Sequence, residues 1–455
     1  MIPAAWRRLW RRALRLGVPA TGQSVAHELM RTIDVVVTAA LSPAAVVAIG
    51  IADLYTSLPE RIGGGVVGAA SILAAQDTGA GADANRDETL TQAALISAAV
   101  VLPFAVVGFG FGAGILRLVG TDAEAARKGG VYLAVIAPTL PMNAVRGTVA
   151  AALRGTGDTK TPMYVSVPTD ALNAAGSVVF GLGVLGAPRL GVAGVAAATL
   201  VSTALAAVAL VAYAVFRSPL EFVWPSNWTV ASQLVRLAAP KSAAGAVTTL
   251  AVFPFNTLLL GFGTAVNAGY QLAWRVYSQL IGPIGSGVGT ATSVIVGQAV
   301  GSGDREETRT AVRALLALGA AVAVTLGAGT VLAARPLAAL LTDDAAVVAS
   351  AAAFIAVHGV VAAVGITNVT ASAVLDAGSE TRIPLASRLL GMVGGMVGVS
   401  WALARGLHLG VVGAYAGLVA CYVLMLAVSA WGVSRADWLG RAATLLDERG
   451  STTDR

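Results

Sequence analysis

The chain has 455 residues, of which 56% are hydrophobic and only 12% are charged, and its mean hydropathy is +0.77. Soluble domains carry about 25% charged residues, so this composition excludes the soluble class and indicates a polytopic membrane protein. The net charge of +6 does not indicate a nucleic-acid partner, because the Lys and Arg residues are dispersed between apolar stretches.

The cysteine and histidine content argues against a metal site. The single cysteine, Cys421, excludes an intramolecular disulfide, and His27, His358 and His408 are scattered without metal-ligand spacing. An enzyme in the membrane would need a metal cluster, or a nucleophile with a base at membrane depth. We therefore expect no metal, no cofactor and no enzymatic activity.

A spanning helix needs about 20 mainly apolar residues, and this rule predicts twelve. The predicted spans are residues 17–41, 46–75, 92–116, 129–152, 162–184, 190–216, 234–261, 267–299, 310–334, 346–373, 383–405 and 409–433. With a cytoplasmic N-terminus, 19 of the 30 Lys and Arg residues fall on the cytoplasmic side and six on the other. This bias predicts that both termini are cytoplasmic.

An internal repeat relates the two halves of the chain. LRGTGDTKTP at residues 153–162 returns as LDAGSETRIP at residues 375–384, and Gln76 near the end of the second span corresponds to Gln298, both at an offset of 222. Six helices per half give both halves the same orientation, so the sequence predicts parallel repeats around a central cleft that holds the substrate.

The repeat also predicts the domain organisation. We expect an N-lobe over residues 1–216, a cytoplasmic linker over residues 217–233, a C-lobe over residues 234–433 and a cytoplasmic tail over residues 434–455. The end of the tail, DERGSTTDR, is expected to be disordered.

The Gly-rich box LRGTGDTKTP reads as a connector between two helices. Gly155 and Gly157 permit a tight turn, Asp158 and Thr159 can cap the next helix, and Pro162 fits its first turn. Without contact to substrate, such a box would be structural only.

The first span carries ionisable residues at membrane depth. An Asp near the centre of a spanning helix costs on the order of 2.5–3.5 kcal/mol to insert, so it usually faces a cavity or a partner. Glu28 and Arg31 have the spacing of an ion pair, which leaves Asp34 without a local partner, and His27 lies on the same stripe two turns away. Asp34 therefore either has a functional role in a cavity or makes a purely structural polar contact.

The fifth span has one polar face, formed by Asp170, Asn173 and Ser177. Asp170 is either a second carboxylate facing the cavity or an N-cap for a helix interrupted at Pro168.

The box, its copy, the VGQAVGSGD end of the eighth span and Asp34 together resemble the MATE (multidrug and toxic compound extrusion) family. The resemblance covers nearly the whole chain, and an acidic residue in the first span is most similar to the prokaryotic DinF-like branch. It implies export of cationic or amphipathic compounds in exchange for H+ or Na+.

The resemblance also implies site residues. The family pattern in the fifth helix is an Asn followed four residues later by an acidic residue, which here are Asn173 and Ser177, and Thr199 matches the family threonine in the sixth helix. The position that corresponds to Asp34 in the second half is Phe255, beside Asn256. The predicted cation-coupling residues are Asp34, Asp170, Asn173 and Thr199, and His27, Ser177, Asn256 and Arg275 are possible cavity-lining residues.

The sequence thus predicts a monomeric, ion-coupled antiporter in the plasma membrane of a prokaryote, with the lipid bilayer and small organic compounds as its partners. The alternative is a flippase for a lipid-linked or polysaccharide precursor. A flippase should have several cationic residues facing the cleft, and the sequence offers chiefly Arg31 and Arg275.

Overall fold

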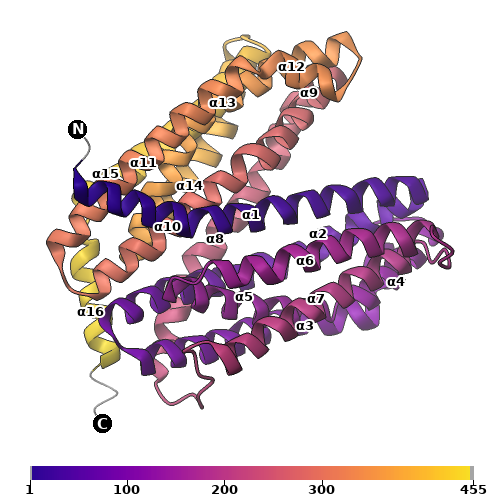
Figure 1. The fold of residues 1–455 in the computed structure, drawn as a ribbon. Coiled ribbons are helices and arrows are strands. Elements are labelled where there is room, and N and C mark those ends of the chain that lie inside the picture. The colour runs from indigo at the N-terminus through magenta and orange to yellow at the C-terminus, as the bar shows by residue number, and fades with distance from the viewer. Residues whose placement is uncertain (1–2, 451–455) are drawn as a thin grey trace. The chain divides into compact units, whose positions relative to one another are not determined.

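The computed structural model describes residues 3–450, and these form helices without any strand (Figure 1). In chain order the elements are α1 (Ala4–Leu41), α2 (Pro43–Ala80), α3 (Asp83–Leu118), α4 (Ala123–Ile136), α5 (Thr139–Thr156), α6 (Lys160–Gly176), η1 (Ser177–Gly181), α7 (Val192–Arg217), α8 (Trp228–Leu260), α9 (Thr264–Val276), η2 (Tyr277–Ile281), α10 (Gly282–Gly301), α11 (Arg305–Leu332), α12 (Ala334–Leu341), α13 (Ala345–Ala377), α14 (Arg382–Leu389), η3 (Leu390–Val399), η4 (Ala402–Gly406), α15 (Val411–Arg435) and α16 (Trp438–Gly450). The η segments are π-helical, which means that their backbone turn is wider than that of an α-helix.

All twelve predicted spans fall on helical segments, which confirms the all-α membrane fold. Most ends agree within about six residues, but α1 and α3 begin 13 and 9 residues before the predicted spans. The fourth span is divided at Pro138, between α4 and α5. Eight helical segments of the described chain are long and apolar enough to cross a membrane by length and composition alone. The first, second, fourth and fifth spans are outside that set, and these helices carry the ionisable residues of the site described below.

The chain divides into two compact units, and four of the five boundaries between them fall inside helices, while the fifth lies in the turn between α2 and α3. We define the N-unit as residues 22–74 and 82–242 with the end of α16 from Arg449, and the C-unit as residues 3–21, 75–81 and 243–448. The boundary in α1 lies two residues after Pro19. The predicted lobe boundaries at residues 216 and 234 stay a prediction.

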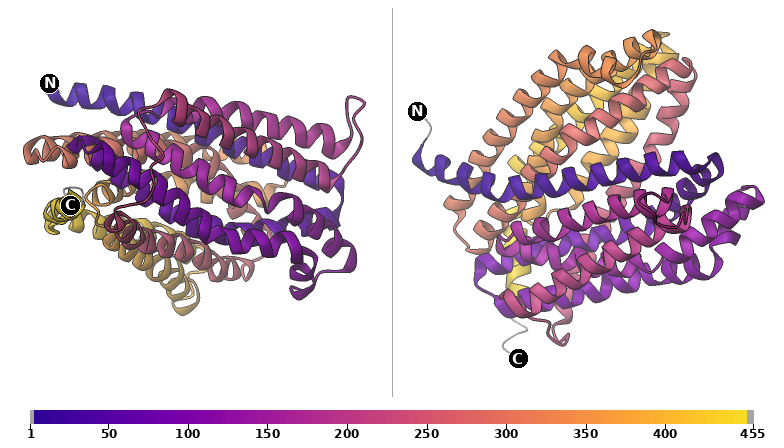
Figure 2. Two further views of the ribbon diagram at one scale, coloured as in Figure 1. Left: turned by 90° about the horizontal axis from the view of Figure 1, so that it is seen from below. Right: turned by 45° about the vertical axis from the view of Figure 1, so that its right-hand side comes forward.

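Each unit is a helical bundle with its own packing. In the N-unit, α3 packs against α4 and α5, and α7 packs against α4, α5 and α6 (Figure 1). In the C-unit, α13 packs against α9, α10, α11 and α15, which are the rose, orange and yellow helices of Figure 2. Small residues permit close approach in both bundles: a side chain at Gly130 of α4 would overlap Ala113 of α3, and one at Gly327 of α11 would overlap the carbonyl of Gly359 in α13. Helices in lipid associate through such close packing rather than through the hydrophobic effect.

The internal repeat extends to the backbone conformation. Gly157 after α5 has φ 95°, and Ser379, 222 residues later, has φ 60° in the corresponding turn after α13. Gly191 and Gly410, which precede α7 and α15, have φ 59° and 58° with ψ −131° and −139°. Corresponding turns in the two halves therefore share a left-handed backbone conformation, even where Gly157 in the first half is replaced by Ser379 in the second.

The Gly-rich box is a cap, as predicted, but not in every detail. Asp158 Oδ1 accepts hydrogen bonds from the backbone N–H groups of Lys160 and Thr161 at 3.1 and 2.9 Å, which confirms its capping role. The Thr159 hydroxyl makes no capping bond, and Gly155 lies in the last turn of α5, so these two assignments were wrong. One carboxylate satisfies both donors, and Gly157 alone makes the turn.

Two repeat-related glycines mark a close helix approach in the C-unit. A side chain at Gly79 would overlap the backbone carbonyl of Gln298, and a side chain at Gly301 would overlap that of Gln76. Both glycines and both glutamines are 222 residues apart, so the two contacts are equivalents of each other under the repeat. Gln76 also donates from Nε2 to the carbonyl oxygen of Ala377 at 2.7 Å.

We expect Gly301→Ala to destabilise the protein, because the added methyl group meets a backbone carbonyl that cannot rotate away. Overpacking of this kind costs about 1–3 kcal/mol, which should lower the melting temperature of the detergent-purified protein by a few degrees. Gly329→Ala in α11 is the control, since nothing lies within 4 Å of a methyl group at that position. Equal melting temperatures for the two variants would contradict the close approach.

The predicted disorder of the tail was wrong for Asp447–Gly450, which belong to α16. The other tail residues, 451–455, lie outside the described range. Helix α16 is ordered because Trp438 is buried in a core cluster of the C-unit and Arg441 forms an ion pair with Glu380 at 2.7 Å.

Candidate functional site

A polar cavity of about 490 Å³ lies inside the N-unit, and we call it the polar cavity. Its walls come from α1, α2, α4, α5, α6 and α7. The titratable side chains that line it are His27, Arg31, Asp34, Asp53, Glu60, Arg61, Tyr132, Arg146 and Asp170. Because several predicted spans contribute these groups, the cavity brings charge together at membrane depth, where charge usually marks a transport pathway.

Asp34 lines this cavity from α1, two turns before the helix ends at Leu41. Its Oδ2 lies 3.5 Å from Nδ2 of Asn173, at the limit of a hydrogen bond. Its Oδ1 is buried and takes no hydrogen bond from the part of the chain that the structure describes. The carboxylate therefore has an oxygen available for a proton or a metal cation.

Asn173 of α6 connects three helices. Its Nδ2 also donates to the Met30 sulfur at 3.0 Å, and its Oδ1 accepts from the hydroxyls of Thr199 at 3.3 Å and Ser177 at 3.5 Å. The structure thus brings Asp34, Asn173, Thr199 and Ser177 into one network, and their predicted roles in cation coupling and in lining the cavity stay predictions. Ser177 begins the π-helical segment η1, and such segments are frequent at functional sites.

Asp170 lies elsewhere in the cavity wall. Helix α6 continues through Pro168, so the alternative that Asp170 caps an interrupted helix was wrong. The Asp170 side chain is 11% exposed, and its Oδ1 lies 3.8 Å from Nδ1 of His27, which is 47% exposed. Asp170 and His27 thus face each other across α6 and α1, and a coupling role for Asp170 stays a prediction.

The two candidates of the second half, Asn256 and Arg275, belong to the C-unit and are not among the residues that line the polar cavity. Asn256 Oδ1 accepts from Asn267 Nδ2 at 3.4 Å and from Gln271 Nε2 at 3.1 Å. Arg275 is exposed on α9. Their predicted role in lining a substrate pathway stays a prediction.

Sequence reasoning missed the acidic residues of α2. Asp53 and Glu60 both line the polar cavity, and Tyr132 of α4 and Arg146 of α5 accompany them. The signal was available, because Asp53 and Glu60 are seven residues apart in a predicted span, the same spacing as His27 and Asp34. The cost of inserting a charge points to α2 as strongly as to α1.

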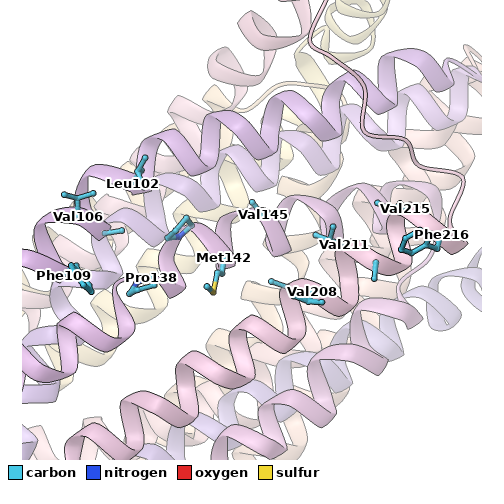
Figure 3. Close-up of a pocket in the computed structure, with 14 residues that line it drawn as sticks. Leu102, Val106, Phe109, Pro138, Met142, Val145, Val208, Val211, Val215 and Phe216 are labelled. Carbon is cyan, nitrogen blue, oxygen red and sulfur yellow. The ribbon is translucent and has the colours of Figure 1, made fainter.

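A second hollow of the N-unit is apolar, with a volume of about 900 Å³ (Figure 3). Its walls are apolar side chains of α3, α5 and α7, among them Leu102, Met142 and Val208, together with Pro138 between α4 and α5. Helix α5 separates the two hollows, because Asn143 and its neighbours line the polar one. With no charged or polar side chain in its wall, the apolar hollow offers no seat for an ion.

These features define a class: a multi-pass helical membrane protein, built from two parallel repeats, with a charged cavity at membrane depth, has the plan of a secondary transporter. The MatE family model matches residues 19–179 and again residues 240–400, so the two matches are 221 residues apart and repeat the internal symmetry. The chain belongs to the MATE family of membrane transporters.

Relatives and solved structures agree with this assignment over nearly the full length. The probable multidrug resistance protein NorM of Bradyrhizobium diazoefficiens is 28% identical over 421 residues, which are 89% of this chain and 88% of the relative. The protein of the same name in Rhizobium meliloti is 28% identical over 430 residues, 91% of both chains. These bacterial relatives place the chain in the prokaryotic branch of the family.

Two solved structures share the fold. An outward-facing multidrug resistance MATE transporter of the MOP superfamily has a TM-score of 0.86 at 20% identity, covering 94% of this chain and 96% of that one. A MOP superfamily transporter from Pyrococcus furiosus, whose binding pocket of reverse polarity is said to suggest a different function, has a TM-score of 0.85 at 21% identity, covering 97% and 99%.

Proposed function

We propose that this protein is an antiporter that exports cationic or amphipathic organic compounds in exchange for H+ or Na+ by alternating access. The observation that carries this proposal is the Asp34 network: a carboxylate in a membrane-depth cavity, held through one oxygen by Asn173 and unpaired at the other. The names of the NorM relatives, which are multidrug resistance proteins, support the substrate class.

The coupling step needs no covalent chemistry. A proton or Na+ neutralises the Asp34 carboxylate, and the hydroxyl and amide oxygens of Thr199, Ser177 and Asn173 can complete the coordination of a metal cation. A coupling ion shifts the transporter only if it binds one conformation better than the other. Pro19, close to the unit boundary in α1, is a candidate hinge for that change.

The geometry of the cavity also supports a second candidate, the flippase for a lipid-linked precursor. Arg31, Arg61 and Arg146 all line the polar cavity, which meets the requirement for several cationic side chains better than the sequence alone indicated. The same wall holds four carboxylates, however, and these oppose an anionic headgroup. For this reason the antiporter remains the first proposal.

Purified protein in proteoliposomes distinguishes the two candidates. We expect an imposed pH gradient or an imposed Na+ gradient to drive efflux of a fluorescent organic cation, with no efflux when both gradients are dissipated. A parallel sample contains a fluorescent polyprenyl diphosphate lipid, whose transbilayer movement is followed by quenching with dithionite. Lipid movement without cation efflux under either gradient would reject the antiporter and favour the flippase.

A further inference from the structure

The network around Asp34 has one negative charge fewer than the family resemblance implies. The resemblance implies an acidic residue at the position of Ser177, where this chain has a hydroxyl, and the carboxylate that α6 does carry, Asp170, faces His27 at 3.8 Å. Asn173, Thr199 and Ser177 are all neutral. We propose that Asp53 of α2 supplies the second carboxylate of the cation site, in place of an acid on α6.

The connection between α1 and α2 places Asp53 beside Asp34. The two helices are separated by Ser42 alone, and Val37 of α1 shares a core cluster with Ala48 and Ala52 of α2. Asp34 lies seven residues before the end of α1 and Asp53 ten residues after the start of α2, which is about 10 and about 15 Å at 1.5 Å per residue. Both carboxylates line the polar cavity, so the two helices present them to the same space.

Tyr132 of α4 fixes the orientation of Asp53. Tyr132 is buried, and its hydroxyl lies 3.4 Å from Asp53 Oδ1. The charges of Asp53 and Asp34 both act on this hydroxyl. Asp53 itself is exposed, and it lines the polar cavity together with Asp34. Carboxylate oxygens of both residues can therefore serve as ligands of a hard cation.

The surrounding charges set the balance. The wall of the polar cavity holds the guanidinium groups of Arg31, Arg61 and Arg146 and the carboxylates of Asp34, Asp53, Glu60 and Asp170. With His27 neutral, three positive and four negative charges leave a net charge of −1, which a coupling cation can neutralise. Without the Asp53 carboxylate the same wall would be neutral.

The inference rests on the proposed function, and its first test uses the same proteoliposomes. The probes are the imposed H+ and Na+ gradients, and the readout is the concentration of the driving ion that gives half-maximal efflux at saturating substrate. We expect Asp53→Asn to raise that concentration about tenfold or more, because a lost charged contact is worth about 1.5–3 kcal/mol. Asp53→Glu should recover most of it.

Three outcomes would overturn the proposal: wild-type ion dependence in Asp53→Asn, a larger loss in Asp170→Asn than in Asp53→Asn, or no recovery in a folded double variant. The double variant is Asp53→Asn with Ser177→Asp, which returns the carboxylate to the family position and should restore the ion dependence. Melting temperature establishes folding, and Ser177→Asp alone serves as its control. If Asp34→Asn abolishes ion dependence and Asp53→Asn does not, this inference fails while the antiporter stands.

Discussion

Asp34→Asn is expected to abolish gradient-driven efflux. The substitution keeps the shape of the side chain and its contact with Asn173, but it removes the charge that binds the coupling ion. An amide neither takes up a proton near neutral pH nor balances the charge of Na+, so neither gradient can be used. Efflux from proteoliposomes under each gradient is the measurement, and it should fall to the level of protein-free vesicles.

The control for Asp34→Asn is Asp343→Asn, a carboxylate exposed in the loop before α13. It should transport at the wild-type rate, and both variants should melt at the wild-type temperature. We also expect the Asp34→Asn variant to bind substrate in the absence of the coupling ion, since this binding does not require the ion to displace the substrate. Wild-type efflux by a folded Asp34→Asn would reject the proposed coupling site.

Asn173→Leu is expected to have the second largest effect. The variant removes the amide that connects Asp34 to the hydroxyls of Thr199 and Ser177, while keeping nearly the same volume. Hydrogen bonds to charged groups are worth about 1.5–3 kcal/mol, so the half-maximal concentration of the driving ion should rise about 10- to 150-fold. Maximal efflux at saturating ion should fall less, because Asp34 keeps its charge.

The matched control for Asn173→Leu is Thr148→Val in the same unit. Thr148 is buried in α5, but its hydroxyl bonds only to its own helix, at Ala144 and Val145, and it does not line the polar cavity. Loss of this hydroxyl should leave the ion dependence unchanged. If both variants weaken ion dependence equally, the effect of Asn173 reflects general packing rather than the network.

Residues of the ion site could be predicted from the sequence only where a charged side chain interrupts an apolar run, because such a charge is costly to insert into a membrane. Asp34 stood out because a charge in an apolar run needs a reason, and the same rule applied to α2 would have found Asp53 and Glu60. Thr199 was identified through the family resemblance, since a threonine in a membrane helix commonly bonds its own backbone. It does so here, to Val195 at 3.1 Å, as well as to Asn173.

The sequence by itself determined the class, the twelve spans and the repeat, because hydropathy over about 20 residues and self-similarity are properties of the linear chain. Only the tertiary structure decided which carboxylate meets which partner. Asp170 faces His27, and Asp53 of α2 lines the same cavity as Asp34. The reason is that helices rich in Ala, Gly and Val show little contrast between their faces, so packing alone sets the rotation that brings polar groups of different helices together.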